Sequence, residues 1–229
     1  MELKRMAFTY LQRYMELEMG DTYQFECQRC GRCCAHPGYF TPESLETAAE
    51  YLGIGKDDFY RRFCSADPES RTIAPKKGGD GFCVLMEKGD GVTACRIHDV
   101  KPDVCRHSPL APLSIAIDLD SLKPVWDDET YFAFFHCRGY GHGEPRIVSA
   151  AVDELGLTSN VAFEVRMLEL LGMELGFEEF MALYRAINRN CESRSTATER
   201  DRNRMRAAVE KVYGLEPSCE EGARVDIVV

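Results

Sequence analysis

Four cysteines within eight residues constrain this chain more than any other feature of its sequence. Cys27, Cys30 and Cys33 recur at i, i+3 and i+6, and Cys34 follows directly. A short loop with this spacing can fold its sulfurs around one centre, and Gly31 supplies the backbone freedom that such a loop needs. Clustered thiolates repel one another and oxidise readily unless a soft metal holds them. The segment predicts a metal or iron–sulfur site, although a chance run of buried cysteines would look similar.

Length and charge exclude some classes of function. The chain has 229 residues, enough for one large domain or two small ones, with 28 basic and 38 acidic residues and a net charge of −10. No basic excess is available for counterion release from a phosphate backbone, so we expect no nucleic-acid partner. The arginine-rich stretch 194–206 has acidic residues between its arginines, which favours a solvated helix face.

The apolar pattern and the cysteine content together predict a cellular location. No stretch approaches the roughly 18–20 apolar residues that a membrane span requires, and charges interrupt the first 20 residues, which do not resemble a signal peptide. Eleven cysteines without a secretion signal indicate a reducing compartment. We therefore expect a cytoplasmic protein without membrane contact.

Hydrophobic spacing predicts an α+β fold for residues 1–143. Amphipathic spacing predicts a helix over 3–19, Thr41 and Pro42 begin a helix that runs to about Leu52, and another helix is expected over 56–63. Strands are expected at 21–27, 82–86, 92–97, 113–117 and 131–135, and those at 82–86 and 92–97 are expected to form a hairpin. Residues 66–81 are expected to be a loop, and one helical turn is expected near Val104. This half is thus a cysteine-rich domain of short antiparallel strands with an N-terminal helix.

Composition changes after Gly143. Residues 147–190 and 195–213 have helical spacing with breaks at glycines, and the second stretch begins at Ser195 or Thr196. We expect residues 144–229 to be a mainly helical region that packs on the cysteine-rich domain. Its apolar stripe around 161–175 favours packing, and a protein partner that docks on the helical half is a further expectation.

Four later cysteines extend the opening cluster. Three of them precede an arginine and one follows a Gly-Phe pair, and a nearby positive charge stabilises a thiolate. Each of these residues alone is more typical of a buried structural thiol. With the opening cluster they give eight candidate ligands, enough for two four-coordinate metals or for one cluster and a mononuclear site: Cys27, Cys30, Cys33, Cys34, Cys83, Cys95, Cys105 and Cys137.

The order of these motifs resembles a known family. The opening Cys-x-x-Cys-Gly-x-Cys-Cys, then Phe82-Cys83-Val84-Leu85, Cys95-Arg96-Ile97-His98 and Lys101-Pro102-x-x-Cys105-Arg106 are similar to the YkgJ-like CxxCxxCC cysteine-cluster proteins, which are described as zinc- or iron-chelating. The similarity covers about residues 27–139. Three positions depart from the family pattern, where Val84, His98 and Lys101 replace a proline, a tyrosine and an arginine. The resemblance implies a metal-binding pocket built from distant segments.

The identity of the metal follows less directly from the sequence. The i, i+3, i+6 triplet is typical of ferredoxin-type [4Fe-4S] clusters, which take their fourth ligand from elsewhere. Zinc sites more often use two CxxC pairs, and this chain has no second pair. An iron–sulfur cluster is therefore favoured over zinc or mononuclear iron.

Five histidines and three further cysteines complete the candidates. For His36, His98, His107 and His136 a hydrogen-bonded imidazole is favoured over direct ligation. His142 lies in a glycine-rich turn that could face a substrate channel. Cys64 ends a helix and is expected in the core, and Cys191 and Cys219 are expected to have no role.

Three hypotheses for function remain at this level. The first is a metal- or cluster-binding protein in cofactor handling or redox. The second is a metal-dependent protein-modifying enzyme, because the resembled family includes proteins similar to lysine N-methylases. The third is a structural zinc module. No phosphate loop, nucleophile elbow or dinucleotide motif supports another enzyme class.

Overall fold

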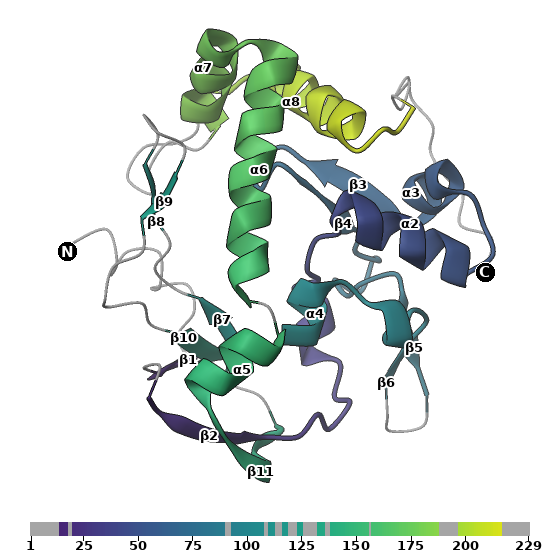
Figure 1. Ribbon diagram of the computed structural model, residues 1–229. Coiled ribbons are helices and arrows are strands. Elements are labelled where there is room, and N and C mark those ends of the chain that lie inside the picture. The colour runs from purple at the N-terminus through teal and green to yellow at the C-terminus, as the bar shows by residue number, and fades with distance from the viewer. Residues whose placement is uncertain are drawn as a thin grey trace.

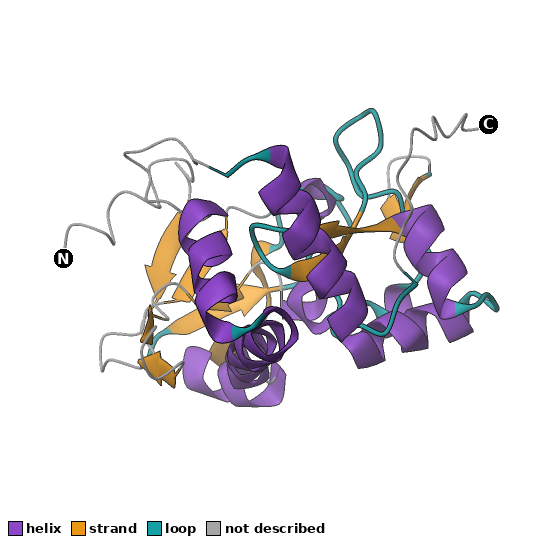
Figure 2. Ribbon diagram, turned by 90° about the horizontal axis from the view of Figure 1, so that it is seen from above, coloured by secondary structure: helices purple, strands orange, loops and turns teal. Residues whose placement is uncertain are grey.

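The computed structural model describes residues 14–17, 20–89, 93–107, 110–112, 116–118, 123–125, 132–135, 138–155, 157–187 and 197–216. Helix α6 (Leu157–Leu175) runs through the middle of the molecule (Figure 1). Helices α7 (Phe177–Ile187) and α8 (Glu199–Val212) lie near one of its ends, and α5 (Val148–Leu155) lies near the other. Short strands are distributed around these helices (Figure 2). The predicted α+β class is confirmed.

The strands near the start of the chain pair with strands from the end of the cysteine-rich half. β1 (Tyr14–Leu17) is antiparallel to β10 (Phe132–Phe135), which also pairs with β7 (Leu110–Pro112). β2 (Thr22–Phe25) pairs with β11 (Tyr140–Ile147). The predicted helix over 3–19 is therefore wrong at Tyr14–Leu17, because long-range pairing with β10 overrides the local helical pattern. The remainder of that predicted helix lies outside the described residues.

Two helices follow the opening cysteine segment. α2 (Pro42–Tyr51) begins with a capping box in which the Thr41 side chain accepts a hydrogen bond from the Ser44 backbone N–H and the Ser44 hydroxyl accepts one from the Thr41 N–H. α3 (Lys56–Phe63) has acidic residues in its first turn and arginines in its last turn, as the helix dipole favours. Both helices match the sequence prediction.

Two antiparallel hairpins come next. β3 (Cys64–Asp67) and β4 (Thr72–Pro75) form a hairpin where a loop was predicted. The strand pattern there is concealed by prolines and charges, and the hairpin is stabilised by burial of residues such as Ile73 on the core. β5 (Met86–Lys88) and β6 (Thr93–Cys95) form the expected second hairpin. Another pair, β8 (Ala116–Asp118) and β9 (Lys123–Val125), lies farther along the chain.

Two short helical segments carry cysteines or lead to one. The 3-10 turn η1 (Arg32–Ala35) contains Cys33 and Cys34. The turn η2 (His98–Val100) leads into α4 (Asp103–His107), the helical turn expected near Val104, which carries Cys105. Helix α8 is capped by Thr198, whose side chain accepts a hydrogen bond from the Asp201 N–H. The helix therefore begins a few residues later than the predicted start at Ser195 or Thr196.

One hydrophobic core joins the two halves of the chain. Fully buried side chains from the cysteine-rich half, including Phe40, Leu85 and Ile97, belong to the same cluster as Leu171 and Phe180 from α6 and α7. The predicted packing of the helices on the cysteine-rich half agrees with this cluster, while the domain boundary at residue 143 stays a prediction. No helix among the described residues is both long enough and apolar enough to span a membrane.

Candidate metal centre

Backbone hydrogen bonds fasten the opening cysteine segment to the β5–β6 hairpin. The Arg29 carbonyl accepts from the Thr93 N–H at 3.0 Å and from the Thr93 hydroxyl at 2.8 Å. Five residues later, the Cys34 carbonyl accepts from the Cys83 N–H at 2.8 Å. Gly31 lies between these attachments with φ 70°, where Thr93 and Met86 leave no space for a Cβ. The position of Cys33 and Cys34 is thereby set by main-chain contacts.

The hairpin positions two more cysteines. Cys83 precedes β5, and Cys95 ends β6 opposite Met86. Leu85 and Ile97, each two residues along the chain from one of these cysteines, are 1% exposed. Because these neighbours are anchored in the core, the two half-buried cysteines are held at the edge of the core.

Cys105 comes from a different element. It lies in α4, and its sulfur accepts a hydrogen bond from the Gly38 backbone N–H at 3.3 Å. Burial raises the pKa of the Cys105 thiol to about 11, and the bond from Gly38 opposes that rise because it favours the thiolate.

Five cysteine thiols gather in one electrostatic neighbourhood. Cys34 interacts with Cys33, Cys83 and Cys95, and Cys105 interacts with Cys33, Cys83 and Cys95. Each negative charge would raise the pKa of the other thiols, so the group resists holding several thiolates without a compensating cation. These mutual electrostatic interactions link Cys33, Cys34, Cys83, Cys95 and Cys105, and we take these five thiols as the candidate site.

Cys33 carries the most acidic thiol of the group. A hydrogen bond with the Cys34 side chain lowers the pKa of Cys33, while burial acts in the opposite direction. The positive charge of Lys101 also lowers it, and the same lysine lowers the pKa of Cys95, where burial dominates and the net shift is upward. The Cys34 pKa is raised, because its proton is used in the bond to Cys33 and its surroundings are desolvated.

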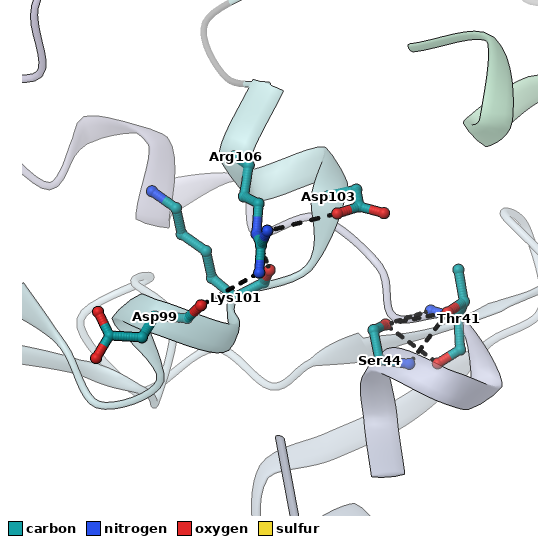
Figure 3. A network of polar contacts seen from close by, with 6 residues as sticks. All are labelled: Thr41, Ser44, Asp99, Lys101, Asp103 and Arg106. Atoms are coloured by element: carbon teal, nitrogen blue, oxygen red, sulfur yellow. Dashed lines mark hydrogen bonds and ion pairs between the residues drawn. The ribbon is translucent and has the colours of Figure 1, made fainter. Parts of the chain in front are cut away.

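The loop that carries Lys101 is held by Arg106. The Arg106 guanidinium donates to the Lys101 carbonyl at 3.0 Å and to the Asp99 carbonyl at 3.2 Å, and it lies 4.0 Å from the Asp103 carboxylate (Figure 3). The Lys101 side chain extends away from Asp103 and Arg106 (Figure 3). Arg106 thus satisfies backbone carbonyls and leaves the charge of Lys101 available to the thiols.

Two of the predicted ligands do not join this group. Cys27 is exposed, and neither Cys27 nor Cys30 is among the main electrostatic partners of the five thiols. Cys30 instead lines an open hollow of about 360 Å³ with Phe82, Met86 and Thr93. Gly31 thus lies between Cys30, which lines this hollow, and Cys33, which belongs to the thiol group, and the prediction of eight ligands that include Cys27 and Cys30 stays untested.

The remaining candidates are placed as follows. Cys137, His136 and the side chain of His107 lie outside the described residues, as do Cys191 and Cys219. His36, His98 and His142 are exposed. Cys64 is 2% exposed, and the prediction that it belongs to the core is confirmed.

The donor set fits a soft metal in its chemistry. Sulfur donors from four chain segments converge, as thiolate-bound zinc or iron–sulfur clusters require. Over the described parts of the chain, no three His, Cys, Asp or Glu side chains are close enough to bind a single ion.

Comparison with known proteins agrees with this donor set. Residues 26–132 match the family model CxxCxxCC, whose description is "putative zinc- or iron-chelating domain". This segment is similar to the CxxCxxCC domain. Its match begins one residue before Cys27 and includes all five converging thiols, and the family description supports metal binding in general. Neither a search of curated proteins nor a search of solved structures found a match.

The sequence pattern did not identify every residue around the candidate site. Lys101 was noted only as a departure from the family pattern, and Gly38 was not singled out. A signal for Gly38 did exist, since a glycine four residues after a double cysteine indicates close backbone approach. Its contact with Cys105 spans 67 residues and is visible only in the folded chain.

Proposed function

We propose that the CxxCxxCC-like segment binds an iron–sulfur cluster through cysteine thiolates and uses it in redox chemistry or in cofactor handling. The observations that support this proposal are the main-chain hydrogen bond that joins Cys34 to Cys83 and the mutual electrostatic interactions of five thiols from η1, the β5–β6 hairpin and α4. A tetrahedral zinc site and a [4Fe-4S] cluster each use four sulfur ligands, so five thiols suffice for either, and the i, i+3, i+6 spacing of the opening cysteines favours the cluster. When bound, such a cluster would supply one-electron transfer at an edge that solvent reaches.

The protein's own residues contribute charge and access. Cys33 is exposed, and the other four thiols are half-buried, so the site opens toward a partner or a small molecule. Lys101 compensates negative charge on the sulfurs, which favours a cluster with several thiolate ligands.

The shared core argues against the alternative of a structural zinc module. In such modules the metal supplies most of the folding free energy, because few apolar side chains are buried. Here Phe40, Leu85 and Ile97 are at most 1% exposed within a core that also includes α6–α8. We therefore expect the apolar core of the described part of this chain to persist without a metal.

A protein partner remains part of the proposal. Met173 in α6 and Phe177 in α7 are 78% and 47% exposed at the junction of these helices. We propose the helical half as a docking region for a protein partner, consistent with these exposed apolar side chains. Cytoplasmic location and the narrower YkgJ-like assignment also remain predictions.

The decisive experiment is anaerobic purification followed by metal analysis, acid-labile sulfide analysis and an absorption spectrum. Iron and sulfide in similar amounts, with broad visible absorption, are the expected result. Colourless protein that contains zinc or iron without sulfide would reject the cluster and support the zinc or mononuclear iron alternative. Protein that binds none of these metals under any condition would reject the proposal.

Single-thiol variants identify the ligands. Cys33→Ser, Cys83→Ser, Cys95→Ser and Cys105→Ser are each expected to reduce bound metal, whereas the buried Cys64→Ala variant is the control that should retain it. Cys27→Ser and Cys30→Ser test whether these two sulfurs also bind the metal. If these two variants lose as much metal as Cys33→Ser, all three sulfurs share one centre, as the sequence spacing predicts.

A further inference from the structure

A main-chain N–H reaches the sulfur of Cys105 from a distant segment. The Gly38 N–H donates to the Cys105 Sγ at 3.3 Å. Hydrogen bonds to the sulfur of a metal-bound thiolate tune its basicity and the properties of the metal that it binds. The contact therefore belongs to the surroundings of the candidate ligand.

The approach of this backbone leaves no space for a side chain. A Cβ built at Gly38 would lie 2.7 Å from the Val104 Cβ and 3.2 Å from the Cys105 backbone nitrogen. Both neighbours are atoms of α4 at or next to the main chain, so they cannot rotate away. Any residue other than glycine would push the 37–39 segment away from Cys105.

Residues from the helical half hold this segment against the core. Phe40 is fully buried, and its carbonyl accepts a hydrogen bond from the Tyr213 hydroxyl at 2.6 Å. Tyr39 stacks on Phe163 of α6 with ring centroids 5.5 Å apart. The Phe40 N–H donates to the Ile73 carbonyl at 2.8 Å, which adds an anchor from β4.

We propose that Gly38 is a positioning residue of the metal centre, and that the helical half keeps its N–H on the Cys105 sulfur through Tyr213 and Phe163. The inference rests on the proposed metal binding by Cys105. It gives residues after 143 a role at a site to which they contribute no ligand. Tyr213 and Phe163 contact the segment at Phe40 and Tyr39, while α4 carries the sulfur that accepts the hydrogen bond from the Gly38 N–H.

The physical reason is preorganisation. A sulfur that already accepts an N–H bond is held in one orientation and is stabilised as the thiolate, so metal binding requires less reordering. Loss of such a neighbour of a metal ligand typically weakens metal affinity by about 10–100-fold. Gly38→Ala should have an effect of that size, and Tyr213→Phe a smaller one, since it removes only one anchor of the segment.

Cobalt(II) titration of the full chain under reducing, anaerobic conditions tests the inference, because thiolate-to-cobalt absorption reports binding directly. Gly38→Ala and Tyr213→Phe are compared with two matched controls. Gly79→Ala places a methyl group where no atom lies within 4 Å, and Tyr184→Phe removes a hydroxyl from a ring that packs on Phe180 and Arg71. Both controls should titrate as the unmodified chain does, and circular dichroism records folding for each variant.

A double-variant cycle separates positioning of Cys105 from a general effect on the fold. In a Cys105→Ala background, adding Gly38→Ala should cause little further loss of cobalt affinity. An undiminished loss in that background would overturn the inference, and so would wild-type affinity in a folded Gly38→Ala variant. If Gly38→Ala does not fold, Tyr213→Phe decides, and unchanged affinity there overturns the inference. An unmodified chain that binds no cobalt would instead reject the proposed metal binding.

Discussion

Single side chains determine how much negative charge the thiol group can hold. Lys101 interacts electrostatically with Cys33 and Cys95, and its backbone is clamped by Arg106. Its contribution is that of a half-exposed charge pair, worth at most about 1 kcal/mol after solvent screening. A contribution of that size changes affinity without deciding whether the chain folds.

Removal of the Lys101 charge should weaken metal binding modestly. We expect Lys101→Gln to reduce cobalt affinity about twofold to fivefold at neutral pH, because the thiolates lose a compensating cation. Lys101→Arg should retain the affinity, since it keeps the charge. Lys211→Gln is the matched control, as Lys211 pairs with Glu174 in the helical half and is not among the charges that shift the pKa of Cys33 or Cys95. Equal affinity of Lys101→Gln and wild type in 20 mM salt would contradict this role.

Cys33 should also react before the other thiols in protein prepared without metal. The hydrogen bond from Cys34 is the main cause of its lowered pKa. Its thiolate therefore forms at a lower pH than the thiolate of an ordinary cysteine. Burial raises the pKa of Cys83 and Cys95, so their thiolates form at higher pH. Mass spectrometry after brief iodoacetamide treatment at pH 7 should find Cys33 alkylated first. Preferential modification of Cys83 or Cys95 would contradict the assignment.

At the scale of elements, local sequence rules account for helices better than for strands. The Thr41 capping box begins α2 at the residue where the sequence predicts it, and α3 matches its predicted bounds. Both helices are specified within a few residues of chain. β1 and the β3–β4 hairpin differ from the prediction because their partners or their buried face come from elsewhere in the chain.

The cap of α2 gives a direct test of this local specification. Thr41→Ala removes the acceptor for the Ser44 N–H, and we expect a loss of about 1 kcal/mol in the free energy of unfolding. Thr47→Ala is the comparison, because Thr47 lies exposed inside the same helix, where alanine is a better helix former. Urea denaturation should show the loss for Thr41→Ala only, and equal stabilities would argue that tertiary packing alone sets this helix.

The candidate site shows the same division between local and distant information. The sequence identifies the donor type and the order of the motifs, since cysteine spacing singles out the opening four cysteines, and the flanking residues and the family resemblance add Cys83, Cys95 and Cys105. It does not show which sulfurs meet. Cys33 and Cys105 are 72 residues apart in the sequence. Packing of η1, the hairpin and α4 allows their thiols to interact electrostatically. The spacing also suggested that Cys30 and Cys33 share a centre, whereas the turn at Gly31 directs Cys30 toward the hollow.

At the scale of the whole molecule, one core unites the cysteine-rich and helical halves. A ligand that binds only the folded state stabilises it in proportion to the logarithm of its concentration over the Kd, about 4 kcal/mol at a thousandfold excess. Chelation should therefore lower the Tm of the loaded protein. Far-UV circular dichroism at 20 °C should still show helix, because the apolar core remains. Loss of helical signal on chelation alone would show that the metal holds the fold together.

The hydrogen bond between the Cys83 N–H and the Cys34 carbonyl closes the chain from 34 to 83 into a loop whose ends are fixed. The α2, α3 and β3–β4 elements all lie inside this loop, and the turn at Glu69–Ser70 between β3 and β4 is exposed. Extra residues at that turn would lengthen the loop without changing the separation of its ends. Related chains could thus differ widely in length between the first and second cysteine motifs and still present the same set of sulfurs.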